Sequence, residues 1–160
     1  ADAASMRTLL TLLQRGTGHA AICEWVVNAA RVKLFLTQQH CLVMFAIAGI
    51  RTPRHDSQDE HERALSDKAL RVMRDKVFQR DVTVDVHMYQ QRSGAFLGDL
   101  FVNRKNIATV LLEQGLARVH EVAARESTHA AEFEAAERRA KAAKKNWWRD
   151  YDEAAERAAA

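Results

Sequence analysis

The fold is decided by residues 20–50, which read AAICEWVVNAARVKLFLTQQHCLVMFAIAGI. Two runs rich in branched and aromatic side chains, 20–27 and 30–36, are separated by the short connection NAA, which is typical of a β-hairpin. A third run, 41–50, follows TQQH and is apolar enough to form a central strand. This segment therefore predicts three consecutive antiparallel strands.

The rest of the chain predicts two more strands and several helices. Residues 81–89 alternate between apolar and polar side chains, which predicts a strand. Residues 94–102 follow the turn QQRS and are expected to pair with this strand as a second hairpin. Residues 62–78 carry an apolar stripe with a period of 3.6, which indicates an amphipathic helix. A helix is also expected over 106–115, closed by Gly115.

The two ends are predicted to be helical extensions. Residues 6–15 suit a short helix, the residues before it are expected to be unstructured, and the segment 116–120 is expected to be extended. The alanine-rich stretch from about residue 123 predicts one long helix or two helices in line. We expect residues 1–19 to be a linker with a short helix, 20–150 the domain, and 151–160 a helical extension toward a following domain.

This element order predicts an α+β fold: a barrel of five antiparallel strands of the OB-fold type, with three helices. No apolar run approaches the ~20 residues needed to cross a bilayer, so we expect a soluble chain without membrane partners. The net charge is +3 and the pI about 9.1, which permits polyanion binding. The basic surplus lies in the first 110 residues, with 15 Lys and Arg against 11 Asp and Glu.

Several stretches of the sequence resemble the staphylococcal nuclease family, and among its members the repeats of the Tudor staphylococcal nucleases. These stretches are RVKLFL, AGIRTPR, LSDKALRVMRDKVFQRDVTVDV, NIATVLLEQGLARV and ESTHAAEFEAAERRAKAAKKNWW. They cover roughly residues 20–150, and the run from Asn106 through Val119 is the most specific. The opening and the exit NWWRDYDE resemble the fourth nuclease repeat of that family, which implies neighbouring nuclease repeats and a Tudor domain.

The resemblance implies catalytic positions that this sequence does not fill with catalytic side chains. Active members use calcium, two metal-binding aspartates, a glutamate that orients water, and two arginines that contact the phosphate. The corresponding positions are Ala30 and Arg51 for the aspartates, Arg54 for the glutamate, and Ala46 and Ala95 for the arginines. A guanidinium repels Ca²⁺ and cannot act as a base, so we expect no metal, no cofactor and no cleavage by this route.

What remains is binding to RNA, to protein partners, or to both. On the barrel surface a cationic rim is expected from Arg31, Lys33, Arg51, Arg54, Arg92, Arg104 and Lys105. Such contacts address phosphates, so binding would be weak and of low sequence specificity. The alternative is that these are ordinary surface cations paired to local acids.

Membership in the Tudor staphylococcal nucleases would imply roles in RNA processing, silencing and transcriptional co-activation. It would also place the protein in the cytoplasm, with the nucleus left open. The alternative function is an active calcium-dependent endoribonuclease, in which this repeat contributes substrate binding to its neighbours. A purely structural spacer between repeats is the third reading.

Other residues are of types that could bind a metal, react as thiols or stack on bases, but we interpret them as structural. The loop HDSQDEHE (55–62) could be imagined as a metal site, but it is expected to be a solvated loop in which an acid between Asp56 and Asp59 caps the following helix. Cys23 and Cys41 are expected to be small buried side chains, with a redox pair as the alternative. Trp25, Phe35 and Phe45 are expected in the core, and Trp148 is expected to latch the last helix onto the barrel, with Trp147 exposed.

Overall fold

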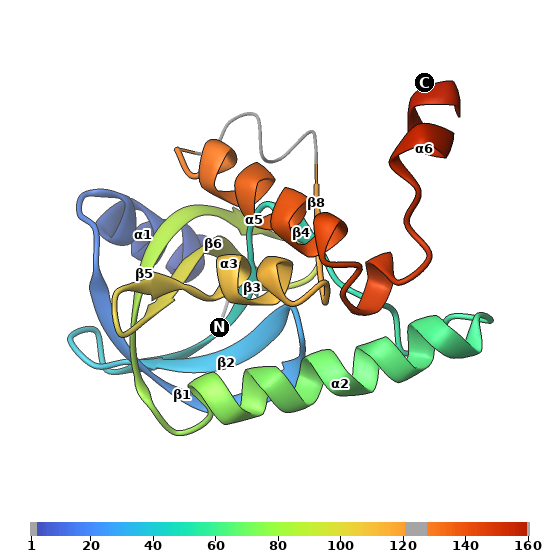
Figure 1. Ribbon diagram of the computed structural model, residues 1–160. Helices are drawn as coiled ribbons and strands as arrows, with labels where there is room; N and C mark the ends of the chain where they lie inside the picture. Colours follow the sequence, from blue (N-terminus) through green and yellow to red (C-terminus); the bar gives the residue numbers. More distant parts are fainter. Residues whose placement is uncertain (1–2, 121–127, 160) are drawn as a thin grey trace.

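A closed β-barrel forms the centre of the molecule in the computed structural model, which describes residues 3–120 and 128–159 (Figure 1). Its strands lie in the order β3-β2-β1-β5-β6, and a further pairing of β3 with β6 closes the ring. The five strands are β1 (His19–Asn28), β2 (Arg31–Leu36), β3 (Cys41–Ile47), β5 (Asp81–Gln90) and β6 (Ala95–Val102). The two predicted hairpins and the predicted OB-type α+β fold are confirmed.

One strand pair corrects the expectation that all five strands are antiparallel. β3 and β6 run parallel, with Met44 opposite Ala95 and Ile47 opposite Gly98. The reason is geometric: every other neighbouring pair of barrel strands is antiparallel. Because strand directions cannot alternate all the way around a ring of five, one pair must be parallel.

The barrel interior is filled by every second side chain of its strands. On β2 the buried residues are Val32, Leu34 and Leu36, and the residues between them face outward. Phe45 and Phe96, from strands that pair directly, are fully buried inside. The period of two that predicts a strand therefore also decides which side chains reach the outer surface.

Helices cover the barrel on several sides (Figure 1). The long α2 (Glu60–Val77) packs beside β1 and buries Leu65, Ala69, Met73 and Val77, the stripe expected from the sequence. Its N-cap is Asp59, whose carboxylate accepts from the backbone N–H of His61. α3 (Ile107–Glu113) and α5 (Ala130–Ala142) pack against one another, and α5 buries Phe133, Ala136 and Ala140.

The N-terminal helix is longer and better packed than expected. α1 (Ala3–Gln14) begins within the segment that was predicted to be unstructured. It contacts β5, and its Leu13 is fully buried while Leu9 is almost so. The apolar side of this helix therefore contributes to the common core.

The C-terminal region corrects the prediction of one long helix or two helices in line. After α5 the chain forms the 3₁₀ turn η1 (Asn146–Trp148) and then α6 (Glu153–Ala159), which points away from the barrel (Figure 1). Lys144 and Asn146 have φ values of 50° and 46°. Left-handed residues end an α-helix, so the alanine-rich stretch is broken after α5. The part of this prediction over 123–127 lies outside the described residues.

The predicted tryptophan latch is present, but Trp147, which was expected to be exposed, forms its contact with the core. Trp147 packs against the hydrophobic core, and its backbone N–H donates to the carbonyl of Gly115 at 3.0 Å. Trp148 is half-buried, and the Arg118 guanidinium lies over both rings, 4.1 Å from the Trp147 centroid and 4.8 Å from the Trp148 centroid. Burial between these rings lowers the pKa of Arg118.

No helix in the described parts of the chain has the length and apolar character that a membrane span requires.

Candidate nucleic-acid interface

The segment AGIRTPR leaves the barrel through a sharp turn at Gly49. Gly49 has φ +83°, and a Cβ there would lie 2.8 Å from Cε2 of Phe133. The chain then forms β4 (Ile50–Arg51), which pairs with β8 (Arg118–Val119), and His120 donates its backbone N–H to the Gly49 carbonyl. The predicted third strand therefore ends at Ile47, and a separate two-stranded sheet fixes the backbone of Arg51.

Beside this exit lies a hollow of about 340 Å³. It brings together the end of the first hairpin, the loop after β4 and one residue of α2. Its lining residues are Asn28, Ala30, Thr52, Pro53, Arg54, His55, Asp56 and Ser66. Ala30 and Arg54, two of the positions implied by the resemblance, therefore face the same hollow.

The charged groups at this hollow are paired with one another. The Arg54 guanidinium lies 3.1 Å from the Asp56 carboxylate, and its hydrogen bond and charge lower the pKa of Asp56. The backbone N–H of Arg54 donates to Glu62 at 2.9 Å. Arg51 is exposed and makes no ion pair within the described residues. Fixed positive charge therefore stands where the family implies a metal ligand and a base.

The donor set at this hollow does not suit Ca²⁺. That ion takes 6–8 oxygen ligands, usually including several carboxylates. The carboxylate that lines the hollow, Asp56, is already engaged by Arg54, and the Asn28 side-chain oxygen accepts from the Ala30 N–H. Within the described residues, no group of three or more His, Cys, Asp or Glu could hold a metal ion.

The two positions implied for phosphate-binding arginines lie on the paired strands β3 and β6. Ala46 is half-buried and pairs with Arg31 on one side and Leu97 on the other. Ala95 is fully buried opposite Met44. A methyl group at each position supplies no charge for a phosphate.

The predicted cationic rim divides into two regions. Arg31 and Lys33 lie on one face of β2, Arg51 and Arg54 lie at the strand exit, and Arg92 lies in the turn that leads to Ala95. Arg104 and Lys105 lie beyond the opposite end of β6, past Val102. Val102 is four residues beyond Gly98, the last partner of β3, a distance of about 13 Å along a strand.

The seven residues of the predicted rim also differ in whether their charge is paired with an acid. Arg54 pairs with Asp56, and Lys105 pairs with Glu113 at 2.9 Å. Burial of Glu113 acts to raise its pKa, but hydrogen bonds from Lys105 and Arg139 outweigh this and lower it. Within the part of the chain that the structure describes, no ion pair is formed by Arg31, Lys33, Arg51, Arg92 or Arg104.

A second hollow lies on the outer face of β1–β3, and sequence reasoning missed it. Its volume is about 570 Å³, and it is lined by Glu24, Trp25, Lys33, Phe35, His40 and Leu42. Trp25 was expected in the core but is 50% exposed, and Phe35 is half-buried, whereas Phe45 is buried as expected. A register shift in β1 between Cys23 and Trp25 turns Trp25 outward, and no local sequence signal marks it.

Sequence reasoning also missed a buried acid on β6. Asp99 is 2% exposed and accepts hydrogen bonds from His87 at 3.0 Å and from the Asn106 amide at 3.3 Å. His129 Nε2 lies 3.6 Å from the same carboxylate. An acid in the middle of the apolar run AFLGDLFV is the signal that could have found it. The group connects the barrel strands β5 and β6 to the starts of α3 and α5.

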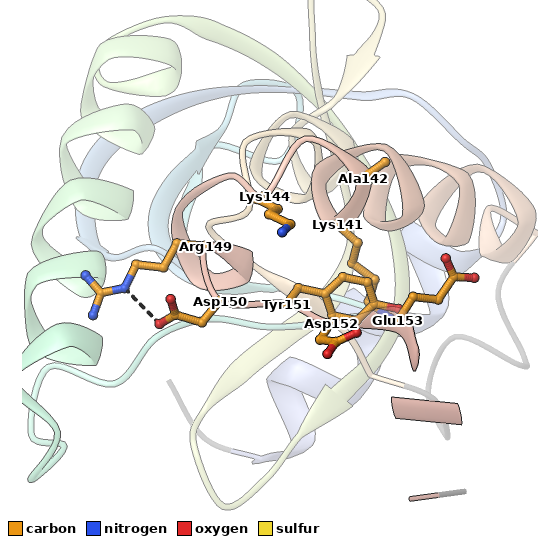
Figure 2. Close-up of a pocket in the computed structure, with 8 residues that line it drawn as sticks. All are labelled: Lys141, Ala142, Lys144, Arg149, Asp150, Tyr151, Asp152 and Glu153. Carbon is orange, nitrogen blue, oxygen red and sulfur yellow. Dashed lines mark hydrogen bonds and ion pairs between the residues drawn. The ribbon is translucent and has the colours of Figure 1, made fainter. Parts of the chain in front are cut away.

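A third hollow lies where the chain leaves α5, and Figure 2 shows its lining. Lys141 and Lys144 come from the end of α5 and the turn after it, while Asp152 and Glu153 come from the start of α6. Arg149 points away from the hollow and pairs with Asp150 (Figure 2). Its lining contains both cations and acids, so it is not specific for either sign of charge.

The comparisons with known proteins agree with this architecture. Residues 44–150 match the family model described as staphylococcal nuclease homologue. The chain is 35% identical over 147 residues to staphylococcal nuclease domain-containing protein 1 of Drosophila melanogaster, covering 88% of this chain and 16% of that protein. It is 36% identical over 151 residues to ribonuclease TUDOR 1 of Arabidopsis thaliana, covering 94% of this chain and 14% of that protein.

The chain therefore spans about one seventh of the length of the curated relatives that it matches. The barrel with its helices forms one nuclease-like unit. The matched family, the extent of the match and the closed barrel agree that this chain belongs to the staphylococcal nuclease homologues, as a single repeat of the Tudor staphylococcal nuclease type.

Proposed function

We propose that this chain is a nuclease-fold module that binds RNA and does not cleave it, as one unit of a longer protein with neighbouring nuclease repeats and a Tudor domain. The observation that carries the proposal is the charge at the hollow beside AGIRTPR. Arg54 lines this hollow in place of a base, Arg51 stands at the adjoining strand exit in place of a metal ligand, and the side chain of Ala30 supplies no oxygen ligand. This set suits a phosphate better than a metal ion.

The binding half of the proposal rests on cations without acidic partners. Arg31, Lys33 and Arg51 make no ion pair within the described residues, and all three lie on or next to the strands that an OB-type barrel uses for nucleic acid. Their contacts would go to phosphates, so affinity should fall steeply as salt rises, with low sequence specificity. Calcium plays no part in this binding.

The wider biology follows from the relatives and is part of the proposal. The names of the relatives include ribonuclease and Tudor, so the whole protein would act on RNA. Roles in RNA processing, silencing and transcriptional co-activation, further protein partners, and a location in the cytoplasm with the nucleus left open belong to the same proposal.

The test is a paired assay of cleavage and binding on labelled single-stranded RNA, with Ca²⁺ and with chelator. We expect no calcium-dependent cleavage and a binding signal that weakens with salt. The variant Arg51→Glu/Arg54→Glu should weaken binding, whereas Arg15→Glu, at an exposed site after α1, should not. Calcium-dependent cleavage that chelator abolishes would instead support the active endoribonuclease suggested by the name ribonuclease TUDOR.

A further inference from the structure

We propose that the outer face of β1–β3 is a subsite that stacks one unpaired nucleobase on Trp25 and holds the adjoining phosphates on Lys33 and Arg31. This inference rests on the proposed RNA binding and assigns it a specific place and form of ligand. It concerns the hollow lined by Trp25, which lies apart from the one beside Arg54, and the two hollows share no lining residue.

The strand register places the needed side chains next to one another. Trp25 lies directly opposite Lys33 across β1 and β2, and Lys33 lies opposite Met44 on β3. Phe35, two residues along β2, lies opposite Leu42. Directly opposite residues have Cβ atoms about 5 Å apart, so these side chains form one continuous outer face.

Trp25 is held in place while half of its surface remains open. The edge of Phe78 meets its ring at a centroid distance of 5.6 Å, and the Arg74 guanidinium lies 5.6 Å from the ring centroid. Both contacts come from the C-terminal end of α2. An indole fixed in this way loses little freedom when a flat ring stacks on it, which favours binding.

The cations on this face are arranged along the strand. Arg31 and Lys33 are two residues apart on β2, so they project from the same face about 6.6 Å from one another. This separation is comparable with one nucleotide of an extended single strand. Neither makes an ion pair within the residues that the structure describes. The acid that lines the hollow, Glu24, is exposed, and a strand running along β2 leaves its charge in water.

The combination favours nucleic acid over an apolar peptide. A peptide that covered Trp25, Phe35 and Leu42 would also bury the Lys33 ammonium without a partner, which is costly. A single-stranded nucleic acid supplies a planar ring for the indole and a phosphate for the ammonium at once. A duplex keeps its bases paired and cannot offer a ring face in this way.

The test compares variants in binding to a labelled single-stranded RNA and to an RNA duplex of the same sequence, by fluorescence anisotropy. Trp25→Leu should weaken single-strand binding by about 5- to 150-fold, the range that base stacking supplies, and leave duplex binding unchanged. Lys33→Gln should reduce the salt slope of binding by about one, and Lys144→Gln, at an exposed site after α5, should not. The tryptophan fluorescence lost in Trp25→Leu should be the part that RNA quenches in the unmodified chain.

The outcomes separate this inference from the function on which it rests. If the unmodified chain binds no RNA, the proposed function fails and the subsite fails with it. If the chain binds RNA and Trp25→Leu binds it equally well, the subsite alone is overturned. Quenching of Trp25 by a peptide of leucine, phenylalanine and aspartate, with no quenching by RNA, would overturn it in favour of protein docking. Trp25→Phe keeps an aromatic ring beside Phe78 and should bind RNA with intermediate affinity. It replaces Trp25→Leu in this test if Trp25→Leu does not fold.

Discussion

The positions of Cys23 and Cys41 in the barrel decide whether these two residues can form a disulfide. Cys23 on β1 lies opposite Leu34, and Cys41 on β3 lies opposite Leu36, so β2 runs between the two thiols. Two strand spacings are about 9.5 Å, beyond the Cα separation of ~7 Å that a disulfide tolerates. Both cysteines are free, and the redox-pair alternative is wrong.

The buried thiol gives a prediction about pH. Burial raises the pKa of Cys23 from 9.0 to about 11, although a contact with the Trp25 carbonyl opposes the shift. The folded state therefore holds this proton more tightly than the unfolded state. Its contribution to stability is present below pH 9.0 and is lost as the pH rises toward about 11.

We expect urea unfolding midpoints to fall over this pH window, and to fall less in Cys23→Ala. Ellman's reagent at about pH 8 should leave Cys23 unmodified until the chain is unfolded. Rapid modification of Cys23 in the folded chain would contradict the burial seen here.

Elements show how the barrel is held closed. The β5–β6 pairing shifts register between Val86 and Met88, and Gly98 lies at this bulge. On its other side Gly98 pairs with Ile47 of β3, and its carbonyl accepts from Ala48 at 2.9 Å. The backbone of β6 therefore approaches both neighbouring strands where the barrel closes.

Gly98→Ala should be among the most damaging small substitutions in the chain. A Cβ at Gly98 would overlap the carbonyl oxygen of Asp85, a backbone atom that cannot move without breaking the pairing. We expect a loss of about 3 kcal/mol or more in the free energy of unfolding, measured by urea titration. Gly16→Ala is the matched control, since its Cβ would meet only the His19 side chain at 3.6 Å, and it should cost less than about 1 kcal/mol.

The buried Asp99 gives a second prediction at this scale. The Asn106 side-chain amide donates a hydrogen bond to Asp99 at 3.3 Å. Asp99→Ala would remove this acceptor and leave the buried amide without it. We expect a loss of about 1–3 kcal/mol in the free energy of unfolding. Asp81→Ala, at an exposed position on β5, should change it by less than about 0.5 kcal/mol. Equal effects of the two substitutions would show that the buried group is not stabilising.

At the scale of the whole molecule, the C-terminal segment has an attached part and a projecting part. η1 is attached by the Trp147 and Asn146 bonds to the Gly115 and Gln114 carbonyls, at 3.0 and 2.6 Å, and by Lys68, which donates to Asn146 at 2.8 Å. In α6, by contrast, the described side chains are exposed. The core is therefore complete before α6 begins.

Two truncations should separate these parts. A chain ending at Asp152 should unfold with a free energy within about 0.5 kcal/mol of the unmodified chain, because α6 buries no described side chain. A chain ending at Lys145 should lose about 2–4 kcal/mol, because Trp147 leaves the core and the Gln114 and Gly115 carbonyls lose their donors. Equal stability of the two truncated chains would contradict the latch.

The sequence by itself determined the five barrel strands, the stripe that α2 buries, and the side chains that stand at AGIRTPR, because these depend on local periodicity and on position along the chain. Only the tertiary structure decided that β3 and β6 are parallel, that Arg51 is fixed by pairing with β8, and that Trp147 rather than Trp148 enters the core. The exposure of Trp25 belongs to the second group, since a bulge in β1 turns it outward. Each of these features depends on contacts between segments far apart in sequence or on a local shift in register, which neither side-chain periodicity nor composition encodes.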